Sequence, residues 1–415
     1  MANGLNQENN PGFQYGATAD GLRFVCRKRV APVEYCGVFI KVGSRDEGED
    51  EYGIAHFIEH TIFKGTATRR SSSIISRMDS IGGELNAYTT KEETAVYSVF
   101  PKGGLKRAIP LIGDLIVNSI FPDEELDKER DVVLDEIESY LDTPAEAVFD
   151  DYDEYFFKGN SLAHNILGTY GSVKSFSSGK CRDFLKKYYT VSNMVFFYVG
   201  AETPKEICRM LEKAFKGISA DVAPLNRVAP ALPEFFSKLK EIDSHQTHTV
   251  IGAMTGGLFA ADRYELALMT NILGGPGMNS KLNVALRERR GLVYMVDAST
   301  ASYTDCGLFT VYFGCDRKDL EKCRRLVRGE IESLADRAMT DRQLKAWKQQ
   351  YLGQMFVAGE NCEQSALSMG RAFLYHNKVL THQEIIDRIN FVTAEDIRAC
   401  ASGILEAGVC SLTLG

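Results

Sequence analysis

The sequence predicts an α+β protein made of two similar domains, and three observations support this prediction. The 415 residues are enough for two or three domains of roughly 100–200 residues each. In both halves, strand-like pairs and helical blocks alternate in the same order. Between the halves, residues 218–234 contain prolines and small residues without hydrophobic periodicity. We therefore expect two domains, each with a mostly antiparallel sheet backed by helices.

The proline-containing middle segment sets the predicted domain boundaries. The first domain is expected over residues 17–217 and the second over 235–415, with an interdomain linker over 218–234. Residues 1–16 are polar and have neither the apolar core of a secretory signal nor the Arg-rich pattern of a transit peptide. We expect them to form a flexible leader, and the cytoplasm is the default compartment.

In the first domain, apolar alternation predicts the strands and 3.6-residue periodicity predicts the helices. The expected strands are 22–28, 34–42, 84–100 (a pair that turns at 91–93) and 195–199. The expected helices are 53–63, 71–80, 105–118, 123–141, 144–157 and 204–215. Gly65 follows the first of these helices, where glycine often ends a helix, and Pro204 opens the last one.

The second domain shows the same succession of hairpins and helical blocks. The expected strands are 238–242, 247–254, 293–302, 307–314 and 409–414. The expected helices are 263–273, 319–335, 341–357, 362–375 and 383–390. This order predicts that the two domains are copies of one fold.

Composition and charge exclude several classes of function. The chain has 48 basic and 56 acidic residues, a net charge of −8, and no basic stripe of the kind that binds nucleic acid. The longest apolar run, 194–201, is far shorter than the ~20 residues of a membrane helix. The ten cysteines are scattered without a CxxC pair, which indicates reduced thiols. Neither nucleic acid nor a membrane is therefore an expected partner.

The segment His56-Phe57-Ile58-Glu59-His60 carries the clearest chemical signal. On a helix, His56 and His60 leave the same face, a spacing that suits two nitrogen ligands of one Zn²⁺. Glu59 lies about 60° from His56 and about 100° from His60 around the axis. It can therefore take a proton from a metal-bound water without ligating the metal. A surface helix with these residues by chance is the less favoured interpretation, because the chain has only seven histidines.

A catalytic zinc needs a third protein ligand, and the predicted helix 123–141 offers two candidates. Glu129 and Glu136 border one side of its apolar stripe. The stripe consists of Leu126, Val133, Ile137 and Tyr140. A carboxylate at a buried edge is costly unless it is paired or bound to a metal. The alternative, in which the helix packs loosely and both glutamates reach solvent, stays open on the pattern alone.

These residues resemble the pitrilysin family of metallopeptidases, the inverzincins, whose zinc motif is His-x-x-Glu-His. The matching segments extend over much of the chain. They are 53–60 with 63–66, 82–89, 273–275, 280–282 and 286–294. In size and order the chain is similar to the β subunit of mitochondrial processing peptidase and its bacterial relatives. The resemblance implies a processing-peptidase-like metallohydrolase fold that closes around a chamber.

The resemblance also implies roles for individual residues. His56, His60 and Glu136 would ligate one zinc ion per chain, with Glu59 as the general base and Glu129 as an acid that supports the ligands. Asn86 and Ala87 would lie on an edge strand that pairs with the substrate backbone, and Arg287 and Tyr294 would contact the substrate from the second domain. On pattern alone, an ordinary edge strand, a surface arginine and a core tyrosine explain the last four residues at least as well.

The expected function is that of a zinc endopeptidase that hydrolyses extended or unfolded peptides. One alternative is a non-catalytic peptide-binding or scaffold subunit of the same fold, although such a protein would usually lack a ligand or the base. Another is a different zinc hydrolase, such as S-ribosylhomocysteinase, which is shorter and uses a cysteine ligand. Relatives of this length close their chamber with a second chain, so we expect a homodimer.

Overall fold

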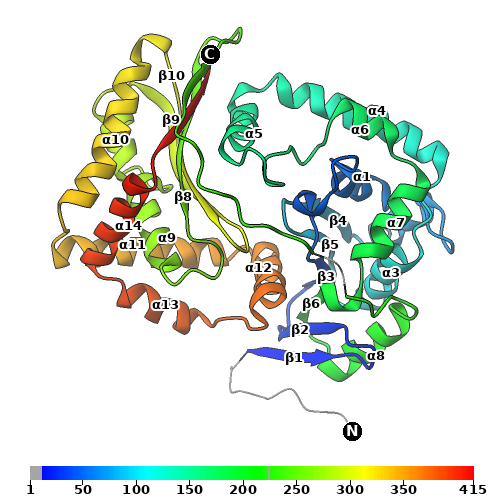
Figure 1. The fold of residues 1–415 in the computed structure, drawn as a ribbon. Helices are drawn as coiled ribbons and strands as arrows, with labels where there is room; N and C mark the ends of the chain where they lie inside the picture. Colours follow the sequence, from blue (N-terminus) through cyan, green and yellow to red (C-terminus); the bar gives the residue numbers. More distant parts are fainter. Residues whose placement is uncertain (1–11, 223–224) are drawn as a thin grey trace. The chain divides into compact units, whose positions relative to one another are not determined.

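Residues 12–222 and 225–415 are described by a computed structural model, which confirms the α+β prediction. The chain divides into two units, each built on one sheet (Figure 1). The first unit contains the described residues up to Ile137 together with His164–Arg227 and Gly359–Thr381. The second contains Glu138–Ala163, Val228–Ala358 and His382–Gly415. The chain passes between the units more than once, and one of these passages follows Arg227, within the segment predicted as a linker.

The sheet of the first unit has six strands in the order β1-β2-β6-β3-β5-β4. These strands are β1 (Phe13–Ala17), β2 (Arg23–Lys28), β3 (Val33–Ile40), β4 (Glu84–Thr89), β5 (Thr94–Pro101) and β6 (Met194–Gly200). Only the β2–β6 pair is parallel among these neighbours. β4 forms one end of the sheet, with Asn86 opposite Tyr97 and Ala87 opposite Val96.

Helices of the first unit bury their apolar faces on this sheet and on one another. They are α1 (Ile54–Thr61), α2 (Ser71–Asp79), α3 (Leu105–Asn118), most of α4 (Asp123–Leu141), α6 (Tyr170–Ser175), α7 (Ser178–Tyr188), α8 (Pro204–Ala214) and α12 (Cys362–His376). Helix α12 packs on β3 and β6. A Cβ atom at Gly370 of α12 would lie 2.7 Å from the rings of Phe39 and Phe197. Glycine therefore allows this close approach of helix and sheet.

The sheet of the second unit has five strands in the order β7-β11-β8-β10-β9, with only β7–β11 parallel. The strands are β7 (Ser237–Lys240), β8 (Thr247–Thr255), β9 (Val293–Ser302), β10 (Gly307–Cys315) and β11 (Cys410–Leu414). The helices are α5 (Pro144–Phe156), α9 (Arg263–Gly274), α10 (Leu320–Asp336), α11 (Asp341–Gly359), α13 (His382–Phe391) and α14 (Ala394–Glu406). In the described ranges, no helix is both long and apolar enough to span a membrane.

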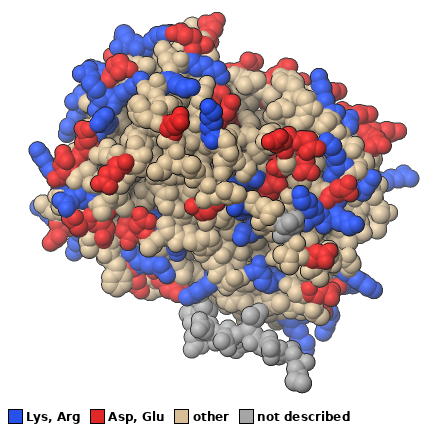
Figure 2. Space-filling view, in the orientation of Figure 1, with Lys and Arg blue, Asp and Glu red and all other residues tan. Residues whose placement is uncertain are grey.

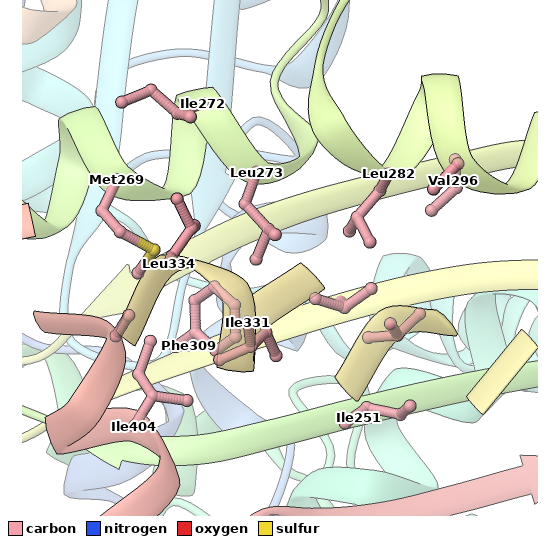
Figure 3. Close-up of a cluster of buried hydrophobic side chains, with 14 of the residues drawn as sticks. Ile251, Met269, Ile272, Leu273, Leu282, Val296, Phe309, Ile331, Leu334 and Ile404 are labelled. Atoms are coloured by element: carbon pink, nitrogen blue, oxygen red, sulfur yellow. The ribbon is translucent and has the colours of Figure 1, made fainter. Parts of the chain in front are cut away.

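A continuous apolar core joins this second sheet to its helices. Figure 3 shows Met269 and Leu273 of α9 facing the strands, with Ile331 of α10 and Ile404 of α14 beside Phe309. A separate buried cluster joins α5 to β8 and β11. It includes Val148, Tyr152, Phe156, Val250 and Leu412. Acidic and basic side chains are interspersed over the face of the molecule seen in Figure 2.

The predicted division into contiguous domains, 17–217 and 235–415, differs from the observed units in two segments. Helix α5 precedes residue 217 but belongs to the second unit, where it packs on β8 and β11. Helix α12 follows residue 235 but belongs to the first unit. Sequence periodicity shows that a helix has an apolar face, but it does not show which sheet buries that face.

The predicted flexible leader over 1–16 is corrected where the structure describes it. Residues 1–11 lie outside the described ranges, but Phe13–Ala17 form β1, which pairs with β2 along its length. The ring of Tyr15 stacks on Phe373 at a centroid distance of 5.3 Å. The strand forms because its aromatic side chains find cover that the local sequence does not reveal. Helices α6, α7 and α14 are further elements that the sequence pattern did not predict.

Buried charges surround the turn between β4 and β5. Lys91, Glu92 and Glu93 form this turn, yet each is at most 6% exposed. Glu92 accepts a hydrogen bond from Arg45 at 2.6 Å. Arg227 donates to both carboxylate oxygens of Asp46 at 2.8 Å and lies 3.3 Å from Glu92. Arg227, the last residue of the His164–Arg227 segment of the first unit, is thus tied to the loops that carry the edge of its sheet.

Replacing Arg227 by alanine should destabilise the first unit by about 3–5 kcal/mol, because Asp46 and Glu92 would remain buried without this cation. Chemical denaturation monitored by far-UV circular dichroism measures the loss. Lys128→Ala is the matched control, since Lys128 forms an ion pair with Glu125 on the exposed face of α4. The control should leave the unfolding midpoint nearly unchanged. Equal midpoints for both variants would show that the Arg227 network contributes little.

Candidate metal centre and catalytic site

Helix α1 brings the His-x-x-Glu-His segment into the core of the first unit. Ile54, Phe57 and Ile58 are fully buried, which fixes the face that the helix presents to the sheet. The preceding residue, Gly53, has φ +92°, and a Cβ atom there would lie 2.6 Å from the carbonyl oxygen of Leu167. Only glycine fits at this position. The remaining face of α1 carries the two histidines.

His56, His60 and Glu136 converge on one point between α1 and α4. Glu136 Oε2 lies 3.7 Å from His56 Nε2 and 3.4 Å from His60 Nε2. The three ligand atoms lie within 4.8 Å of one another. Metal–ligand bonds of 2.0–2.2 Å in a tetrahedron separate ligand atoms by about 3.4 Å. The observed separations therefore suit one tetrahedral zinc ion, and no other such group is found among the described residues.

Two further observations test whether these residues fit a metal. Glu136 Oε2 is buried, yet it has no hydrogen-bond partner among the described residues. Such an atom is costly unless something else satisfies it. Burial and the neighbouring His60 lower the pKa of His56 to about 3, so its imidazole stays neutral near pH 7. A neutral imidazole is the form that binds a metal. The donor set thus fits zinc.

Glu59 lies beside this group but is not part of it. The hydroxyl and backbone N–H of Thr89, the last residue of β4, hydrogen-bond to its carboxylate. Burial raises the pKa of Glu59 above its ordinary value, while the Thr89 hydrogen bonds and His60 oppose that rise. A half-buried carboxylate held in this way can accept a proton without binding the metal itself.

Glu129 lies on α4, as Glu136 does, and its carboxylate contacts one of the two histidines. Its Oε2 lies 3.4 Å from His60 Nδ1, and its Oε1 lies 2.5 Å from Lys64 Nζ. A carboxylate on the second ring nitrogen orients a metal-ligating histidine. Glu129 is only 9% exposed, so the open alternative of a loosely packed helix is wrong for this residue. Sequence reasoning did not assign a role to Lys64, which lies in the bend that follows α1.

Asn86 and Ala87 lie where the sequence predicts an exposed edge. Both are partly exposed on β4, which has β5 as its only strand neighbour among the described residues. Helix α1 packs beside β4, and Thr89 Oγ1 lies 3.5 Å from the carbonyl oxygen of Ala55. The free edge of the sheet and the helix with both histidines are therefore neighbours.

Arg287 and Tyr294 belong to the second unit. Arg287 is the last residue but one of a π-helical segment, Asn283–Glu288, and Tyr294 is the second residue of β9. Both line a hollow of about 510 Å³ together with Met278 and Asp297. Tyr294 is 84% exposed. The alternative of a core tyrosine is therefore wrong.

Comparison with known proteins places the chain in a family. Residues 23–170 match the family described as Insulinase (Peptidase family M16), and residues 175–351 match the Peptidase M16 inactive domain. An uncharacterized zinc protease of Streptomyces coelicolor is 31% identical over 378 residues, covering 89% of this chain and 82% of that protein. The uncharacterized zinc protease YmxG of Bacillus subtilis is 31% identical over 367 residues, covering 88% of each.

Solved structures agree on the fold. A protease from Helicobacter pylori superposes with a TM-score of 0.90 at 18% identity, covering 97% of this chain and 99% of the other. A peptidase M16 inactive domain from Pseudomonas fluorescens gives the same TM-score and identity, covering 97% of each chain. The fold and the His-x-x-Glu-His helix define a metallopeptidase architecture. The chain belongs to peptidase family M16, the pitrilysin family of zinc metallopeptidases.

Replacing His56 or His60 by alanine should abolish stoichiometric zinc retention, because two ligands hold a zinc ion far more weakly than three. Metal analysis after gel filtration measures the zinc content. His245→Ala is the control, since His245 is exposed in the second unit. Tight zinc at the wild-type ratio in either test variant would refute the ligand assignment.

Proposed function

We propose that this protein is a zinc endopeptidase that hydrolyses extended or unfolded peptides. The observation that carries the proposal is the meeting of His56, His60 and Glu136 beside a separate carboxylate, Glu59. Three protein ligands leave one position open, as in catalytic zinc sites. The proposal includes one zinc ion per chain.

The residues divide the chemistry between them. When bound, the zinc ion polarises the scissile carbonyl and makes water more acidic. Glu59 accepts the proton of the attacking water and delivers it to the leaving amine. Thr89 holds Glu59 in place during both transfers, and Glu129 orients His60.

The free edge of β4 suits a substrate whose backbone is extended. An edge strand offers N–H and C=O groups that a peptide can pair with by strand addition. A folded protein has already paired most of these groups. We therefore propose that Asn86 and Ala87 bind the backbone of unfolded peptides beside α1.

Arg287 and Tyr294 are proposed to contact the substrate. Their exposure and shared hollow support this role, as does the resemblance of 286–294 to the family's pattern. A tyrosine hydroxyl can donate to a developing oxyanion, and an arginine can bind peptide carbonyls.

Replacing Glu59 by glutamine should preserve zinc binding but reduce turnover by roughly 10²–10⁴-fold, because the amide cannot act as a base. Cleavage of a quenched, unstructured peptide measures turnover, with chelator-treated wild type as the blank. Glu124→Gln, an exposed change on α4, should be fully active. A wild-type protein that binds zinc and peptide but does not cleave would instead support the non-catalytic subunit.

Replacing Tyr294 by phenylalanine should lower kcat by about 10-fold or more while the zinc content stays constant. Steady-state kinetics on the same peptide provide the measurement. Tyr155→Phe alters an exposed tyrosine elsewhere in the second unit and should have wild-type kinetics. If kcat is unchanged in the Tyr294 variant, its hydroxyl has no role in the reaction.

We also propose that the protein is a homodimer with two equivalent sites. Each chain carries both the zinc motif and the Arg287–Tyr294 pair, so a different partner chain is not required. Two-fold association is the commonest form of oligomer. Light scattering over a dilution series should give twice the chain mass of 46.1 kDa. A monomer with full activity throughout the series would contradict this assembly.

A further inference from the structure

The backbone N–H groups at the amino end of α1 have an unusual hydrogen-bond acceptor. Helix α1 spans only eight residues, and its first N–H groups have no partner within the helix. The preceding Gly53 has no side chain that could accept their hydrogen bonds. Serine, threonine, aspartate or asparagine commonly performs this task at the residue just before a helix. Here the acceptor comes from outside the helix.

Glu47 supplies that acceptor with both of its carboxylate oxygens. Oε2 accepts a hydrogen bond from the backbone N–H of Gly53 at 2.8 Å, and Oε1 accepts one from Ala55 at 2.9 Å. The side chain of Glu47 is completely buried. Ala55 immediately precedes His56, so the carboxylate holds the backbone next to the first zinc ligand.

His164 completes the surroundings of Glu47. Its Nε2 lies 3.1 Å from Glu47 Oε2. The imidazole stacks on the ring of Tyr52 at a centroid distance of 4.0 Å, and Lys91 Nζ donates to the backbone carbonyl of His164 at 2.5 Å. Burial lowers the pKa of His164 to about 4. Near pH 7 the ring is therefore a neutral neighbour that fixes the carboxylate by hydrogen bonding and packing.

This arrangement is costly for stability alone. Burial raises the pKa of Glu47 well above its ordinary value, against the lowering effect of the Ala55 and Gly53 hydrogen bonds. A smaller polar residue nearer the helix could satisfy the same N–H groups at lower desolvation cost. What Glu47 provides is a two-point attachment that resists both translation and rotation of the first turn of α1.

A metal centre needs this kind of precision. Ligating groups must be held within about 0.5 Å of the productive geometry. Both His56 and His60 lie on α1, so any shift of its first turn displaces them together relative to Glu136 on α4. The apolar face of α1 fixes its depth in the core, but apolar contacts are not directional.

We propose that Glu47 is a positioning residue of the metal centre. Through its hydrogen bonds to the backbone of Gly53 and Ala55, it holds the two histidines of α1 in the positions that zinc binding requires. This inference rests on the proposed zinc site. Glu47 itself is outside the group of ligand atoms.

The test compares Glu47→Gln with Glu51→Gln. The glutamine keeps the size of Glu47, but its NH₂ group cannot accept a hydrogen bond, so one of the two attachments is lost. Glu51 lies in the same loop, and its carboxylate accepts from Gly48 rather than from α1. Zinc affinity is measured by competition with a chromophoric chelator. Supporting residues around metal ligands typically contribute 10–100-fold to metal affinity, and we expect a loss in this range for Glu47→Gln and none for Glu51→Gln.

A second readout separates positioning from a general structural role. The visible absorption spectrum of the Co²⁺-substituted protein reports ligand geometry, and it should change in Glu47→Gln but not in Glu51→Gln. A merely structural role would lower the melting temperature of the zinc-free and zinc-loaded forms equally, with zinc affinity and the Co²⁺ spectrum unchanged. That result would overturn the inference.

Glu47→Asp provides the conservative variant. It retains both acceptor oxygens on a side chain one methylene shorter, so its zinc affinity should lie between those of wild type and Glu47→Gln. If Glu47→Gln does not fold, the aspartate variant decides, and wild-type affinity with a wild-type Co²⁺ spectrum overturns the inference. If the unchanged protein binds no zinc, the proposed function fails as well, and this outcome is visible before any variant is made.

Discussion

The convergence of two imidazoles and one carboxylate in a half-buried space is the constraint on which the rest of the first unit depends. His56, His60 and Glu136 come from two helices, and the separations of their ligand atoms match one tetrahedral ion. A buried, unpaired carboxylate oxygen would be unfavourable without a bound cation. Interactions other than those among the ligands must therefore hold α1 and α4 in their relative positions.

Buried polar contacts are among these interactions. Glu129 joins His60 to Lys64, Thr89 joins Glu59 to the edge strand, and Glu47 joins the start of α1 to His164. Such contacts are directional, and their contribution to stability falls steeply when one partner moves. They constrain the positions of the candidate metal ligands, whereas apolar packing alone would tolerate small shifts.

The two units also depend on each other through the chain itself. Helix α5 covers apolar residues of the second sheet, and α12 covers those of the first, although each comes from the opposite half of the sequence. Neither half of the chain therefore carries every helix of one unit. Cutting the chain at the linker would leave both sheets with an exposed apolar face.

The sequence by itself determined the chemistry of α1 and the nature of most elements. The four-residue spacing of His56 and His60 fixes a common helical face whatever surrounds it. The apolar stripe of α4 likewise indicated Glu129 and Glu136, because periodicity along a single helix is a local property. The fold class followed from the same local patterns.

The tertiary structure alone decided which partners those local elements meet. The sequence predicts a turn at 91–93, but only the tertiary structure shows that the turn is buried, with Arg45, Arg227 and Arg371 paired with its carboxylates. Likewise, Phe13–Ala17 became a strand because β2 and Phe373 cover it, and the buried carboxylate of Glu47 meets His164, which lies 117 residues further along the chain. Contacts between residues distant in the chain leave no periodic trace, since their free energy depends on what the fold brings together and not on the neighbouring sequence.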